Sequence, residues 1–172
     1  LYFGRTLFGL HMLSFRRPEY PAEERGRREL VRLPPPRYEP RTGYGGLSIT
    51  SIDVPQQLPS GETIHLRLTR LAGADVAPGL PPVLLLHGFG SGGIQFTHPA
   101  IKTPLAPWLA KEHRRDVWVA ELRTSIGLPT AARQWVMDDV ALQDIPRLVE
   151  TVCQRTGRPQ LQVVAHCIGA AM

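Results

Sequence analysis

One cysteine in this sequence stands where a catalytic nucleophile would be exposed. Cys167 lies in the segment AHCIG (residues 165–169), directly after the apolar run at residues 161–165. A nucleophile on a sharp turn between a strand and a helix needs small residues two positions before and after it, because these pack closely together. Ala165 and Gly169 meet that need. The pattern predicts a nucleophile elbow, with a helix N-terminus that favours the thiolate form of Cys167.

The alternative for Cys167 is a small buried hydrophobic residue, which is what most free cysteines are. The flanking small residues and the preceding apolar run favour the nucleophile. Cys153 has no such context and is predicted to be structural. His166 adjoins Cys167, but neighbouring residues of an extended strand face opposite sides, so it is not expected to act as the general base.

A second chemical signal is the segment HGFG, which begins at His87 and ends the apolar run at residues 82–86. In a fold with a nucleophile elbow, the loop at this place supplies one backbone N–H to an oxyanion hole, and the residue after the nucleophile supplies the other. The candidate amides are those of Phe89 and Ile168. Gly88 lets the backbone approach a substrate oxygen, and His87 is expected to be a structural hydrogen-bonding residue. The simpler alternative is a plain glycine turn.

The segments that must position these residues begin with a hairpin. Residues 47–52 and 64–69 alternate apolar with polar side chains, which is typical of half-buried strands. Residues 59–62 (PSGE) form a turn between them. The hydrophobic pattern then changes to continuous apolar runs at residues 82–86, 116–120 and 161–165. Such runs are expected for strands buried on both faces of a parallel sheet.

Two helices are predicted between the buried strands. One spans residues 104–113, with an apolar face formed by Leu105, Trp108 and Leu109. The other spans residues 138–156 with a regular apolar stripe, Asp138 as N-cap and Gly157 as its stop. Pro146 should kink or restart this second helix. The alternation of strands and helices predicts an α/β fold, with a mostly parallel sheet and helices on both faces.

Composition bounds the remaining possibilities. The chain has 172 residues, a formal net charge of +5 and two cysteines, which suit one domain in a reducing, cytoplasmic compartment. No apolar run approaches the length of a membrane span, and no metal site is expected.

Residues 1–45 hold nine Arg, no Lys and five Glu. We interpret them as an Arg/Pro-rich linker rather than a nucleic-acid or lipid patch, because aromatic residues are not interleaved with the arginines. Residues 46–172 are the predicted hydrolase portion.

Four blocks of the sequence resemble a known group of enzymes. In order they are VLLLHGFG (residues 83–90), DVWVAELRTSIGLP (116–129), DDVALQDIP (138–146) and TGRPQLQVVAHCIGA (156–170). Together they resemble the α/β-hydrolase domain fused behind bacterial cholesterol-oxidase-like oxidoreductases of the glucose-methanol-choline type. Acid lipases are similar but have serine in the elbow. Polyhydroxyalkanoate synthases share a cysteine elbow but do not usually keep the His-Gly loop.

The resemblance implies an esterase, thioesterase or acyltransferase acting on a small lipid-like substrate through Cys167. The implied oxyanion donors are Phe89 and Ile168. It also implies that residues 1–45 connect a fused oxidoreductase to the hydrolase domain. No flavin-binding Gly-x-Gly-x-x-Gly motif follows a strand here, so no cofactor is expected in this chain, and any FAD would belong to the fused upstream part.

Two other hypotheses stay open: a catalytically silent module that binds lipid or serves as a scaffold, and an acyltransferase like polyhydroxyalkanoate synthase. In this fold the triad order is nucleophile, acid, histidine, and the chain ends five residues after Cys167. We therefore expect the N-terminal half of an α/β-hydrolase fold, truncated after the elbow and unable to turn over substrate.

The upstream acids Glu121, Asp138, Asp139 and Asp144 are in the wrong order for the triad. They are expected to cap helices or face solvent, with Asp144 structural. The strand at residues 161–165 should keep an unpaired apolar edge that favours aggregation.

Overall fold

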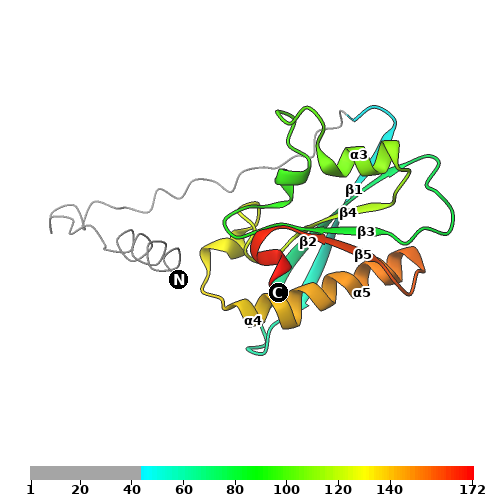
Figure 1. Cartoon of the computed structure of the whole chain (residues 1–172). Coiled ribbons are helices and arrows are strands. Elements are labelled where there is room, and N and C mark those ends of the chain that lie inside the picture. The colour runs from blue at the N-terminus through cyan, green and yellow to red at the C-terminus, as the bar shows by residue number, and fades with distance from the viewer. Residues whose placement is uncertain (1–43) are drawn as a thin grey trace, which may run out of the picture. The chain divides into compact units, whose positions relative to one another are not determined.

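The computed structural model describes residues 44–172 (Figure 1). Nearly all of the predicted linker, residues 1–45, therefore lies outside the described residues, and its boundary at residue 46 stays a prediction. The described part is an α/β fold in which one sheet is covered by helices on both faces. No helix among residues 44–172 combines the length and the apolar character needed to cross a membrane.

The sheet has five strands in the order β1-β2-β4-β3-β5. Strand β3 runs parallel to β4 and β5, whereas β2 is antiparallel to both β1 and β4. The prediction of a mostly parallel sheet is thus correct for the last three strands, and the N-terminal hairpin makes the sheet mixed. The strands are β1 (Leu47–Gln57), β2 (Thr63–Gly73), β3 (Val83–Leu86), β4 (Val117–Glu121) and β5 (Gln162–Ala165).

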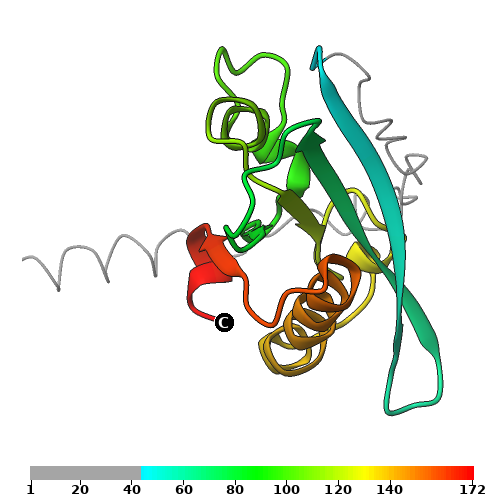
Figure 2. The same cartoon turned by 90° about the vertical axis from the view of Figure 1, so that its right-hand side faces the viewer.

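Two helical layers sandwich this sheet. In Figure 1, α3 (Leu105–Glu112) lies above it, and the segment made of α4, η3 and α5 lies below it. Alternate residues of the buried strands divide between these layers, as expected for strands covered on both faces. Leu84 and Trp118 pack toward α5, and Val83 and Val119 pack toward α3. Figure 2, turned by 90°, shows the two layers on opposite sides of the strands.

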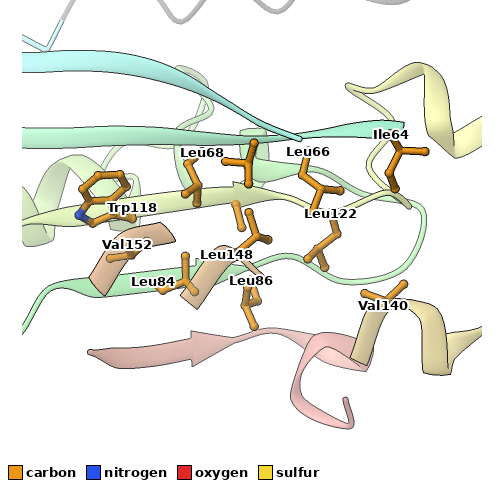
Figure 3. Close-up of a cluster of buried hydrophobic side chains, with 12 residues drawn as sticks. Ile64, Leu66, Leu68, Leu84, Leu86, Trp118, Leu122, Val140, Leu148 and Val152 are labelled. Atoms are coloured by element: carbon orange, nitrogen blue, oxygen red, sulfur yellow. The ribbon is translucent and has the colours of Figure 1, made fainter. Parts of the chain in front are cut away.

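The larger core cluster joins strands β2, β3 and β4 to the lower helical layer (Figure 3). Its members come from β1 to β4, from the residue after β4, and from η3 and α5, and they recur every second residue in the strands and every fourth in the helix. The buried residues of this cluster are Val54, Ile64, Leu66, Leu68, Leu84, Leu86, Trp118, Ala120, Leu122, Val140, Leu148 and Val152.

The buried face of α3 differs from the prediction. Its fully buried residues are Ala106, Pro107 and Ala110, while Trp108 is 39% exposed and packs edge-on against His113. Leu105 and Leu109 only flank the core. Small side chains face the sheet because they let the helix approach it closely. The predicted face of Leu105, Trp108 and Leu109 is therefore wrong for Trp108, its central residue.

The long helix is one continuous helical segment with a widened turn. It begins with α4 (Met137–Asp139), passes through a π-helical turn, η3 (Val140–Asp144), and continues as α5 (Ile145–Thr156). Pro146 lies in the first turn of α5, where its missing N–H is tolerated. A restart of the helix is predicted at this proline. The regular α-helix does begin again at Ile145, directly after the π turn.

Both ends of this helical segment are set by identifiable residues. Gly157 ends it with φ 65°, as predicted. The predicted N-cap is wrong, because the N-cap is Val136, whose backbone N–H donates to the Asp139 carboxylate at 3.1 Å. Asp138 is an exposed residue of the first turn, where a carboxylate suits the helix dipole.

Strand β5 lies at one end of the sheet and pairs only with β3 among the described strands. Val163 and Val164, which would be buried in an interior strand, are 48% and 40% exposed. An apolar edge strand of this kind is a template for pairing with other chains, so the expected unpaired edge is confirmed.

Candidate active site

Cys167 occupies a strained turn at the end of β5. The strand ends at Ala165, and Cys167 begins the short 3-10 turn η4 (Cys167–Ala170) with a φ of 58°, a left-handed backbone conformation that is rare outside glycine. Its side chain is exposed. A nucleophile elbow combines this strain with an exposed reactive atom. The helical segment behind the elbow is a single 3-10 turn.

The elbow is pressed against the loop that follows β3. A Cβ atom added to Gly88 would lie 2.8 Å from the Cβ of Cys167, and one added to Gly169 would lie 2.8 Å from the carbonyl oxygen of His87. Real Cβ atoms do not approach other atoms this closely, so glycine is required at both places. The His166 N–H donates to the Leu86 carbonyl at 3.0 Å and extends the β3–β5 pairing up to the turn. Gly169, one of the two small residues predicted to flank Cys167, thus lies at this contact, together with Gly88 of the loop.

The two predicted oxyanion donors are the backbone N–H groups of Phe89 and Ile168. Neither the Phe89 N–H nor the Ile168 N–H has a hydrogen-bond acceptor within residues 44–172. Ile168 directly follows Cys167, and Phe89 directly follows Gly88, the residue that contacts Cys167. Unpaired N–H groups beside an exposed thiol are the parts that an oxyanion hole needs.

His87 is a buried structural residue with both ring nitrogens engaged. Its Nε2 accepts a hydrogen bond from the Leu122 N–H at 3.1 Å, and its Nδ1 lies 2.8 Å from the Gly88 carbonyl oxygen. Since Nε2 accepts, the ring is neutral and Nδ1 carries the proton that it donates to Gly88. Burial lowers the pKa of His87, opposed by the Gly88 carbonyl and the Glu121 carboxylate. The ring thereby joins the ends of β3 and β4 and fixes the peptide that carries the Phe89 N–H.

The lowered pKa of His87 predicts acid sensitivity. The folded state favours the neutral ring, so its contribution to stability is present above the unfolded pKa of about 6.5 and is lost as pH falls below it. Urea unfolding between pH 7.5 and 5.5 should show a loss of up to about 1.4 kcal/mol per pH unit from this group. His87→Gln should remove that slope, and the exposed His98→Gln should retain it. An unchanged slope in His87→Gln would contradict the assignment.

His166 lies closer to the elbow than strand alternation suggests. Its Nδ1 lies 3.3 Å from the position of a Cβ on Gly88, the same glycine that contacts Cys167. The alternation fails because β5 ends at Ala165 and the left-handed Cys167 redirects the chain. No hydrogen bond joins His166 to Cys167 in the part of the chain that the structure describes, so this geometry assigns no general base.

Two of the upstream acids are buried, contrary to the expectation that they face solvent. Asp144 is fully buried and receives bonds from Arg123 at 2.9 Å (Nε) and 2.7 Å (Nη2), as well as from the Arg123 backbone N–H at 3.2 Å. Burial raises the pKa of Asp144, and the bonds and charge of Arg123 oppose that rise. Glu121 is 4% exposed and accepts a hydrogen bond from the Ser125 hydroxyl. The structural role expected for Asp144 is thus supported by this pairing.

One feature beside the elbow was missed by the sequence analysis. The Phe89 ring is 65% exposed, and its centroid lies 5.9 Å from that of Trp135. Trp135 also lines an open hollow of about 510 Å³ together with Arg133, Gln134, Val136 and Asp139. The signal in the sequence was an aromatic residue within each of two loops that follow strand ends. Only the fold places them side by side.

Comparisons with known proteins find likeness only among solved structures. No family model matches the chain, and no curated protein matches it. A bacterial heroin esterase is 16% identical over 73% of this chain, with a TM-score of 0.46, and the esterase Est22 is 19% identical over 71%, with a TM-score of 0.46. Cfl2 from Burkholderia cenocepacia is 21% identical over 77%, with a TM-score of 0.45. The chain spans 35–36% of the length of these proteins.

The fold class follows from the chain's own geometry. A parallel strand that ends in a left-handed residue, a helical turn after it, and a glycine loop after the neighbouring strand are the parts of an α/β-hydrolase sheet around its elbow. The described residues therefore have the arrangement of an α/β-hydrolase sheet around its elbow.

Proposed function

We propose that this chain carries the nucleophile half of a cysteine-dependent hydrolase or acyltransferase. The observation that carries the proposal is the exposed Cys167 in a left-handed turn, held against a loop whose Phe89 N–H has no acceptor among residues 44–172. The Cys167 sulfur attacks the carbonyl carbon of an ester or thioester. The oxyanion that forms receives hydrogen bonds from the Phe89 and Ile168 amides.

The second half of the reaction is the transfer of the acyl group. As the tetrahedral intermediate collapses, the carbonyl re-forms, the alcohol or thiol leaves with a proton, and an acyl-cysteine remains. Water or another acceptor then takes the acyl group and regenerates the thiol. In the triad order of this fold, the acid and the histidine follow the nucleophile. We therefore assign neither role to a residue that precedes Cys167.

An apolar substrate suits the surroundings of the proposed nucleophile. The exposed Phe89 ring and its Trp135 partner form an aromatic wall beside the Phe89 amide, next to the hollow lined by Val136. Burial of an acyl chain on such a wall contributes about 25 cal/mol per Å² of apolar area removed from water. The finer assignment to lipid-like esters and to a fused oxidoreductase rests on the sequence resemblance alone.

The test is selective modification of Cys167 on the full 172-residue chain. We expect iodoacetamide to alkylate Cys167 at least about tenfold faster than the less accessible Cys153. An activated thioester such as an acyl-thiophenol should leave one acyl group, located by mass spectrometry at Cys167 and absent in Cys167→Ala. Cys153→Ala is the matched control and should acylate normally. Acylation that persists in Cys167→Ala would overturn the proposal.

A proline variant separates oxyanion stabilisation from simple exposure. Phe89→Pro removes the proposed N–H donor, whereas Phe89→Ala removes the ring and keeps the donor. Loss of one oxyanion donor should slow acylation by about 10²-fold, while alkylation, which forms no oxyanion, should change little. Equal slowing of both reactions in Phe89→Pro would point to a displaced loop. It would favour the alternative of a catalytically silent module, for which the exposed aromatic wall would serve as a lipid-binding surface.

A further inference from the structure

A second cavity lies where strands β3 and β4 begin, at the opposite end of the strands from Cys167. It has a volume of about 240 Å³ and is bordered by Pro82 and Asp116, which directly precede β3 and β4. Cys167 instead follows the end of β5, which runs parallel to β3. Parallel strands all begin on one side of a sheet and all end on the opposite side. This cavity lies where strands begin and the elbow lies where a strand ends, so they are separate sites. Three arginines, Arg70, Arg155 and Arg158, and part of the loop between β2 and β3 also line the cavity.

The charges that line this cavity do not balance. Arg70 is held by Asp116 through two bonds, of 2.7 and 2.9 Å, so these two groups neutralise each other. Arg155 and Arg158 have no carboxylate partner within residues 44–172. Three guanidinium groups and one carboxylate thus leave the cavity with two uncompensated positive charges. Asp75, in the loop beside Val76, is occupied by Arg114 at 2.9 Å and does not reduce this excess.

The position of the two free arginines is fixed by the end of α5. Arg155 lies in its last turn, and Gly157 turns the chain with φ 65° so that Arg158 follows on the cavity side. The attraction of a cation to the helix C-terminus accounts for one of these residues, Arg155. It does not account for a second arginine beyond the cap.

The opposite wall of the cavity is apolar. It comes from the loop between β2 and β3, where Val76, Pro78 and Leu80 line the cavity and Leu80 is 44% exposed. A ligand that fits both walls has an anionic end and an apolar body. Guanidinium groups match the oxygens of a phosphate in paired hydrogen bonds, and a phosphate monoester carries nearly two negative charges at neutral pH.

We propose that this cavity binds an organic phosphate, with the phosphate on Arg155 and Arg158 and the apolar part against Pro78 and Leu80. Arg70, neutralised by Asp116, borders the site and is not proposed as a phosphate ligand. The site is independent of the proposed acyl-transfer chemistry, so either one stands if the other fails.

Calorimetric titration of the full chain with phenyl phosphate tests this site. We expect phenyl phosphate to bind more tightly than inorganic phosphate, because only the former reaches the apolar wall. It should also bind more tightly than benzoate, which carries a single charge. The double variant Arg155→Ala/Arg158→Ala should lose at least about tenfold in affinity, in line with the strength of charge-assisted hydrogen bonds.

The matched control removes two arginines from elsewhere on the surface. Arg67→Ala/Arg147→Ala changes the net charge equally, and these residues line neither this cavity nor the hollow beside Trp135. It should keep the affinity for phenyl phosphate within about twofold, since screened charges at a distance contribute little. Equal loss in both double variants would show general charge attraction and overturn the proposal. So would a phenyl phosphate affinity no greater than that of inorganic phosphate or benzoate.

Discussion

Asp144→Ala is expected to destabilise the fold by about 3–5 kcal/mol, because it leaves the Arg123 guanidinium buried without its partner. Arg123 is 6% exposed and Asp144 is fully buried, so water does not replace the lost bonds. The pair also ties the segment after β4 to the π turn, through the Arg123 side chain and its backbone N–H. Urea unfolding monitored by circular dichroism measures the loss.

Two comparisons identify the buried charge as the cause. Removing an exposed pair of the same chemistry with Glu150→Ala, the partner of Arg147, should cost less than about 0.5 kcal/mol. The double variant Arg123→Met/Asp144→Leu removes both charges and should recover much of the lost stability, as buried pairs replaced by apolar residues do. A double variant no more stable than Asp144→Ala would mean that the cavity, rather than the unpaired charge, causes the loss.

Gly169→Ala is expected to displace the elbow and to cost about 2–3 kcal/mol. Its added Cβ would lie 2.8 Å from the His87 carbonyl oxygen and 3.4 Å from that of Leu86. Both are backbone atoms of β3 and its loop, which cannot rotate away as a side chain would, so overpacking is relieved only by moving the turn. The iodoacetamide reactivity of Cys167 should change along with the stability.

Gly45→Ala is the control for this substitution. Neither glycine has a positive φ, so alanine is permitted by the backbone at both positions. A Cβ on Gly45 meets nothing within 4 Å, and the variant should match the original chain within about 0.5 kcal/mol. Gly169→Ala with the stability and thiol reactivity of the original chain would contradict the tight packing of the elbow.

The elements that were predicted from the sequence are those with an uninterrupted hydrophobic period. The strands of the hairpin and sheet are of this kind, although β1 and β2 continue to Gln57 and Gly73, beyond the predicted residues 52 and 69, and β5 is not buried on both faces. The face of α3 was mispredicted because burial there selects small residues, Ala106 and Ala110, over the larger Trp108. The size of an apolar side chain is a poor guide to its burial where a helix lies close to a sheet.

The elbow was predictable because its constraint is local: small residues at fixed spacing around Cys167. The buried pair was not, because Arg123 and Asp144 lie 21 positions apart and only the fold joins them. A signal for it did exist. Asp144 stands between Val140 and Leu148 at steps of four, a charge within the apolar stripe of a helix. The Phe89–Trp135 contact had no comparable pattern.

The π turn at Val140–Asp144 makes this part of the molecule sensitive to length rather than to residue identity. A π turn holds about one residue more than the α-helical turn it replaces, and Leu142 within it is 74% exposed. Substituting Leu142 should cost little, and deleting it would leave an α-helical turn with the flanking helical segments in phase. Inserting a residue would instead rotate the following helix by about 100° relative to Val140 and turn Asp144 away from Arg123. Over evolutionary time, insertions should therefore be excluded between residues 140 and 148, whereas a single deletion should be tolerated at the π turn, and changes of both kinds should accumulate in open turns such as residues 59–62.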